Sequence, residues 1–88
     1  KYIDLTLGAS GTTYTAPANG WIYCSGRAVA TPAYISIDIP YTFCGINGVI
    51  NTDLTINQIA VKSGTVFALR YSNTTINYLR FVYAQGDQ

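Results

Sequence analysis

Apolar and polar residues alternate with a period of two along much of this chain, and this alternation constrains the fold more than any other feature. Between Ala33 and Ile39, three isoleucines fall on one side of an extended chain, and tyrosine, serine and aspartate fall on the other. Successive side chains of a β-strand point to opposite faces, so this segment predicts a strand with one buried face. No segment shows helical spacing. We therefore expect an all-β fold without helices.

Turn signals recur at roughly ten-residue spacing, which is typical of sandwiches and barrels built from short strands. In Ala16-Pro17-Ala18-Asn19-Gly20, the proline presets φ and the Asn-Gly pair tolerates positive φ, so the chain can reverse direction there. A bulge is expected at Gly26, and another irregularity where the apolar phase changes between Ile56 and Ile59. The pattern gives about seven or eight short strands and predicts a compact antiparallel β-sandwich, jelly-roll-like, over residues 1–88.

Trp21 begins the strand that follows this turn. We expect its large ring to cover one end of the sandwich core, and the alternative is a tryptophan that stacks on a ligand.

The stretch from Tyr41 to Gly48 follows Pro40 and contains two glycines and an Asn-Gly pair. We expect an irregular loop there. Long loops on a rigid β scaffold often carry binding sites, so this loop is a candidate contact surface, with strand connection or subunit packing as the alternative.

The residue inventory argues against catalysis. Histidine is absent, which removes the usual general base and the most frequent transition-metal ligand. Asp38 and Asp53 are candidates for a carboxylate pair or for calcium ligands, but no spacing pattern supports either. We expect a protein that is not an enzyme and that has no cofactor and no metal.

Two further classes of function are not expected. The formal net charge is +1, and the five basic residues are scattered rather than clustered, so nucleic-acid binding is not expected. No apolar run approaches the roughly 18 residues that a spanning helix requires, so we expect no membrane insertion.

Only 10% of the residues are charged and 49% are hydrophobic. An 88-residue chain of this kind is expected to bury part of its surface in a symmetric oligomer.

Cys24 and Cys44 are the only cysteines. A disulfide between them would close a loop of about 20 residues and contribute roughly 3 kcal/mol to stability. Buried free thiols are the alternative, and the sequence leaves both possibilities open.

Three segments of the sequence resemble a known protein family: Tyr14–Ile22, Ile59–Val66 and Leu79–Gly86. In this order they look like the C-terminal head domains of bacteriophage tail fibres and receptor-binding proteins, which resemble jelly rolls of the C1q and tumour-necrosis-factor type. The resemblance implies a homotrimeric head in the tail appendage of a virion, outside the cell, with no catalytic motif. It also suits a chain that starts at Lys1 without a methionine, which we expect to be part of a longer fibre or adhesin.

We therefore expect a non-enzymatic head that attaches to a bacterial cell-surface saccharide or protein. Aromatic rings can stack on sugar faces and amides can donate hydrogen bonds, which selects Tyr34, Tyr41, Phe43 and Asn47 as candidate ligand-binding residues. One alternative is a trimerisation or capping module without a ligand. Another is a secreted, lectin-like monomer stapled by Cys24 and Cys44.

Overall fold

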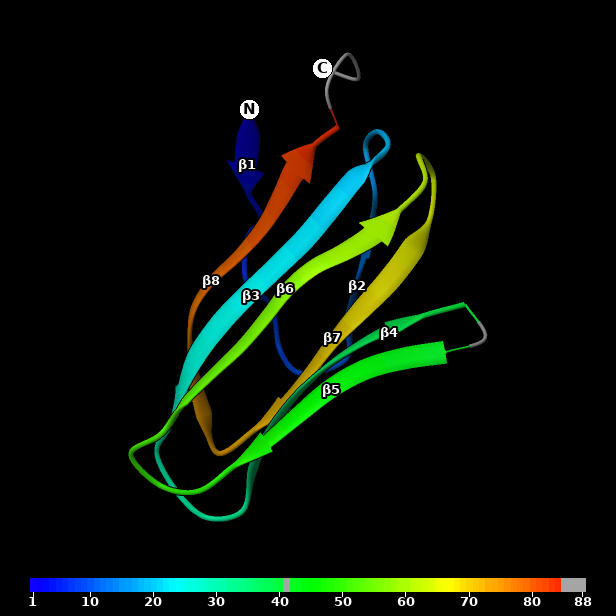
Figure 1. Cartoon of the computed structure of the whole chain (residues 1–88). Coiled ribbons are helices and arrows are strands. Elements are labelled where there is room, and N and C mark those ends of the chain that lie inside the picture. Colours follow the sequence, from blue (N-terminus) through cyan, green and yellow to red (C-terminus); the bar gives the residue numbers. More distant parts are fainter. Residues whose placement is uncertain (41, 85–88) are drawn as a thin grey trace.

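Eight strands and no helix make up the part of the chain that the computed structural model describes, residues 1–40 and 42–84 (Figure 1). The strands are β1 (Tyr2–Asp4), β2 (Thr12–Thr15), β3 (Gly20–Ala28), β4 (Ala33–Ile39), β5 (Thr42–Gly48), β6 (Asp53–Val61), β7 (Val66–Ser72) and β8 (Thr74–Tyr83).

The strands form two four-stranded antiparallel sheets. The first sheet has the order β1-β8-β3-β6, and the second has the order β2-β7-β4-β5. β1 pairs with β8 and β3 with β6 in the first sheet, and β2 pairs with β7 and β4 with β5 in the second. This nested order is that of a jelly roll. The prediction of an all-β, jelly-roll-like sandwich is confirmed.

The core lies between the two sheets. Its largest fully buried side chains are Phe67, Phe81, Ile22, Ile35, Ile37, Leu54, Leu69, Leu79 and Cys24. The alternation that predicted the strands also selects these residues, since they occupy every second position where a strand faces the other sheet. In β4, Ile35 and Ile37 are fully buried and Ile39 is partly buried, as the isoleucine pattern predicted.

Both predicted irregularities are present in the first sheet. The pairing of β3 with β6 shifts register between Ile59 and Ile56, and Gln58 there has a φ of 57°. The pairing of β3 with β8 shifts between Ser25 and Gly26. These shifts let each strand keep its apolar residues on the core side despite the change of phase in the sequence.

The prediction of a loop between Tyr41 and Gly48 is wrong for the residues that the structure describes. Thr42–Gly48 form β5, which pairs with β4 over its whole length and lies at the edge of the second sheet (Figure 1). An edge strand needs only one ladder of hydrogen bonds, and therefore tolerates glycines that weaken a central strand. Tyr41 lies outside the described residues.

The prediction of a core tryptophan is also wrong. Trp21 is half-buried and lies on the outer face of the first sheet, because its neighbours Gly20 and Ile22 both face the core. Its partners across the strands are Ala60 on β6 and Val82 on β8.

Candidate functional site

Three of the residues selected from the sequence lie on one surface, the outer face of the β4–β5 hairpin. Tyr34 and Asn47 are directly opposite each other across the two strands, and Phe43 is opposite Asp38. Phe43 is 71% exposed and Tyr34 is 38% exposed. Tyr34 and Asp38 are four residues apart, so this surface extends over about 13 Å along the strands. We call it the hairpin face.

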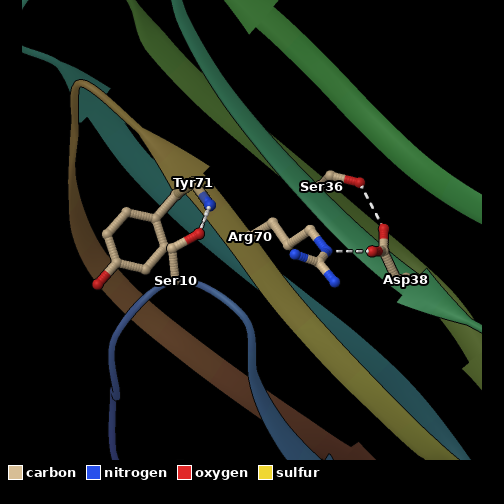
Figure 2. Close-up of polar contacts among 5 residues, drawn as sticks. All are labelled: Ser10, Ser36, Asp38, Arg70 and Tyr71. Atoms are coloured by element: carbon tan, nitrogen blue, oxygen red, sulfur yellow. Dashed lines mark hydrogen bonds and ion pairs between the residues drawn. The ribbon is translucent and has the colours of Figure 1, made fainter.

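A polar network centred on Asp38 lies within the hairpin face (Figure 2). The Arg70 side chain donates from Nε to Asp38 Oδ2 at 2.6 Å, and Ser36 Oγ donates to Asp38 Oδ1 at 2.9 Å. The hydrogen bond from Arg70, and then that from Ser36, lowers the pKa of Asp38 below its usual value. The carboxylate is therefore ionised at neutral pH, and its oxygens are held in fixed positions on the sheet.

The backbone next to Arg70 is anchored to the connection between β1 and β2. Tyr71 N donates to Ser10 Oγ at 2.9 Å (Figure 2), and the Tyr71 hydroxyl donates to the Gly8 carbonyl at 2.9 Å. On the same connection, the Tyr14 hydroxyl donates to the Thr6 carbonyl at 3.0 Å. These hydrogen bonds hold the connection between β1 and β2 against β7, the strand that carries Arg70.

A second group of aromatic residues lies on the outer face of the first sheet. The Arg80 guanidinium carbon is 4.2 Å from the ring centroid of Tyr2 and 4.6 Å from that of Tyr78, and Arg80 Nε is 2.7 Å from Asp4 Oδ1. Tyr23 on β3 is the cross-strand partner of Arg80. Cation–π contact holds the rings of Tyr2 and Tyr78 against one guanidinium, so this sheet presents an aromatic surface. We call it the Arg80 face, and it consists of Tyr2, Asp4, Tyr23, Tyr78, Arg80 and Val82.

Trp21 lines an open pocket of about 420 Å³ at one end of the first sheet. The pocket lining consists of Asn19, Gly20, Trp21, Ala60, Val61, Lys62 and Ala84. Two backbone hydrogen bonds shape it, from Ala84 N to the Asn19 carbonyl at 2.9 Å and from Gly64 N to the Ala16 carbonyl at 2.8 Å. Ser63 N also donates to Asn19 Oδ1 at 2.9 Å. The turn before β3 is thus tied to the end of β8 and to the turn after β6.

Sequence reasoning did not find this pocket, although a signal was present. Ile22 and Cys24 alternate with Trp21 and Tyr23 along the strand. If Ile22 and Cys24 face the core, then Trp21 and Tyr23 lie on the outer face. The residue of β6 that pairs with Trp21 could not be predicted from the sequence. Ala60 and Trp21 are more than thirty positions apart in the sequence, and only the register of β3 with β6 makes them neighbours.

Cys24 and Cys44 are free thiols, so the disulfide considered from the sequence is not formed. Cys24 is fully buried in the core, whereas Cys44 is exposed on β5, so the alternative of two buried thiols holds for Cys24 alone. Burial raises the pKa of the Cys24 thiol to about 12, and it remains protonated and unreactive at neutral pH. The lectin-like monomer stapled by this pair loses its proposed source of stability.

The two carboxylates considered from the sequence, Asp38 and Asp53, lie in different sheets. Asp38 lies on the second sheet and is paired with Arg70, whereas Asp53 lies on the first sheet and is paired with Arg27 at 2.8 Å. The two carboxylates therefore do not form a pair. Within residues 1–40 and 42–84, no group of three or more metal-ligating side chains occurs, and no helix is long and apolar enough to cross a membrane.

Comparisons with protein-family models, with curated proteins and with solved structures found no match for this chain.

Proposed function

We propose that this chain is the non-enzymatic attachment head of a bacteriophage tail fibre or a similar virion appendage, and that it binds a saccharide on the bacterial surface at the hairpin face. The observation that carries the proposal is the exposure of Phe43, 71% accessible, beside a fixed polar network on a rigid sheet. A large exposed aromatic side chain next to ordered hydrogen-bonding groups is typical of recognition surfaces.

The chemistry of the hairpin face suits a saccharide. Phe43 and Tyr34 offer apolar rings for the C–H faces of sugars, and Asn47 offers an amide that both donates and accepts. Asp38 Oδ1 and Oδ2 accept bonds from Ser36 and Arg70, and an ionised carboxylate has further lone pairs for sugar hydroxyls. Gly45 lies opposite Ser36, so no side chain separates Phe43 from Asn47 on the outer side of β5. The surface is thus continuous along the hairpin and suits an oligosaccharide.

An array of bacterial surface glycans tests this proposal. The wild-type chain is expected to bind a subset of the glycans, and Phe43→Ala is expected to weaken that binding at least tenfold, about 1.4 kcal/mol. Val29→Ala is the control, because Val29 is an exposed apolar residue, 56% accessible, in the connection between β3 and β4 and outside both the hairpin face and the Arg80 face. Equal binding by Phe43→Ala and the wild type, or equal losses in both variants, would contradict the assignment of the hairpin face.

We further propose that the head is a homotrimer whose subunits pack through the Arg80 face. The support is the composition of that face: the Tyr2 and Tyr78 rings contact a single guanidinium whose charge Asp4 neutralises, and Tyr23 and Val82 are the cross-strand neighbours of Arg80 and Tyr2. Aromatic residues and arginine are enriched at protein interfaces. A trimerisation or capping module without a ligand is the second candidate function, and this same surface favours it.

Light scattering on the purified chain tests the assembly. The wild type is expected to have three times the mass of the 9.5 kDa chain. Val82→Glu is expected to give monomers, because it places an unpaired carboxylate in the proposed interface, at a cost of several kcal/mol. Val66→Glu, on the outer face of the second sheet, is the matched control and is expected to remain trimeric. A wild type that is monomeric at all concentrations refutes the trimer.

A further inference from the structure

We propose that the pocket beside Trp21 binds a sugar ring that carries a carboxylate. This site is separate from the hairpin face. The inference shares with the proposed function only the premise that the chain holds saccharides.

The shape of the pocket follows from small residues around one large ring. On the outer face of the first sheet, the partner of Trp21 on β6 is Ala60, and Gly20 and Ala84 also contribute no bulk to the lining. The resulting volume of about 420 Å³ falls within the range of small-molecule sites, about 300 to 1,000 Å³. The space suits one sugar ring with its substituents beside the indole.

The charge of the pocket points to an anionic ligand. Among residues 1–40 and 42–84, Lys62 is the only charged residue that lines the pocket, and none of the lining residues is acidic. The three arginines each have an aspartate partner, in the pairs Arg27–Asp53, Arg70–Asp38 and Arg80–Asp4. Lys62 has no ion pair of this kind within residues 1–40 and 42–84. One ammonium without an aspartate partner, in a lining whose other described residues are uncharged, complements a single negative charge.

The remaining polar groups suit a sugar rather than a simple anion or a hydrocarbon. No side-chain hydrogen bond among the described residues involves the Trp21 indole N–H, and the Asn19 side chain uses its carbonyl oxygen for Ser63 N. The indole N–H and the Asn19 amide N–H groups are therefore available as donors at the pocket. An apolar ring, several donors and one cation match the apolar face, the hydroxyls and the carboxylate of an acidic sugar.

The chain reports on this site directly, because Trp21 is its only tryptophan. Titration with methyl β-glucuronide is expected to change the indole fluorescence saturably. Methyl β-glucoside, the neutral sugar of the same shape, is expected to bind about fivefold more weakly, since a partly exposed ion pair contributes up to about 1 kcal/mol. Acetate, the anion without a ring, is expected to leave the fluorescence unchanged. Equal affinity for the two glycosides, or an equal response to acetate, overturns the inference.

Charge variants test the role of Lys62. Lys62→Gln is expected to abolish the preference for the glucuronide, and Lys62→Arg is expected to retain it. Lys1→Gln, which removes the same charge from the other lysine of the chain, is the control and is expected to retain the preference. If Lys1→Gln and Lys62→Gln lose it equally, the effect is one of net charge and the pocket assignment fails.

A filling variant tests the pocket itself without removing the tryptophan. Ala60→Leu is expected to abolish glucuronide binding measured by calorimetry, and Thr55→Leu, on the outer face of the same strand but outside the pocket, is expected to leave it intact. Binding that survives Ala60→Leu overturns the inference. Glycan-array binding that depends on Phe43, together with no glucuronide response at Trp21, rejects this site and leaves the proposed function standing. A glucuronide response at Trp21 without any glycan-array binding supports this site and rejects the proposed function.

Discussion

Replacing Phe81 with alanine is expected to lower the free energy of unfolding by about 3 to 5 kcal/mol, the usual cost of removing a buried phenylalanine ring. Phe81 is fully buried and lies on β8 between two neighbouring strands, with its ring edge-on to Tyr83 at 5.1 Å between centroids. Domains have a total stability of only about 0.05 to 0.15 kcal/mol per residue. The loss is therefore a large fraction of the whole, and urea unfolding followed by circular dichroism measures it.

Phe43→Ala is the matched control for this experiment. It removes the same side chain from a position that is 71% exposed, so the free energy of unfolding is expected to change by no more than about 0.5 kcal/mol. Equal destabilisation by the two variants would contradict the assignment of Phe81 to the core and Phe43 to the surface. The control also supports the glycan experiment, because a variant that folds normally loses binding only through its altered surface.

The strands and the core were predictable because each depends on local alternation. Ile35 and Ile37 are buried for the same reason that Tyr34 and Ser36 are not, and a strand transmits this pattern without reference to its partners. Gly26 and the Ile56–Ile59 phase change predicted bulges for the same local reason. The nested strand order agrees with the jelly-roll prediction, which came from strand number and spacing together with a resemblance.

The predictions that failed each relied on the type of a few residues rather than on the pattern of the whole segment. Two glycines and a preceding proline suggested a loop, but Thr42–Gly48 is held extended by pairing with β4. Trp21 was assigned to the core by the size of its ring, although the alternation around it favoured the outer face. In each case one strong local signal was given more weight than the period-two pattern.

The candidate sites combine predictable and unpredictable parts. Tyr34 and Asn47 were selected for their chemistry, and it is the register of β4 with β5 that makes them neighbours. Arg70 was not selected, because it lies 32 positions after Asp38 in the sequence and reaches it from another strand. Contacts of this kind follow from topology, and no local feature of the sequence encodes them.

Replacing Gly20 with alanine is expected to cost at least about 2 kcal/mol, since forcing extra atoms into a packed site strains the backbone or displaces neighbouring groups. Gly20 begins β3 and faces the core. A Cβ atom there would overlap the Val82 carbonyl oxygen and lie 2.6 Å from Cζ of the Phe81 ring. Because a carbonyl of the neighbouring strand cannot rotate away as a side chain can, β3 and β8 must separate at Gly20, which lines the pocket.

Gly45→Ala is the control that separates this steric requirement from the general effect of glycine in a strand. At Gly45 the nearest atoms to an added Cβ are the Ile35 carbonyl oxygen at 3.4 Å and Ser36 Cβ at 3.6 Å, which are ordinary contacts. Alanine is favoured over glycine in strands by about 0.5 to 1 kcal/mol, so this variant is expected to be as stable as the wild type or slightly more stable. Thermal unfolding of both variants measures the difference. If Gly20→Ala unfolds at the same temperature as Gly45→Ala, then β3 and β8 do not approach as closely as the structure places them, and the pocket beside Trp21 has a different shape.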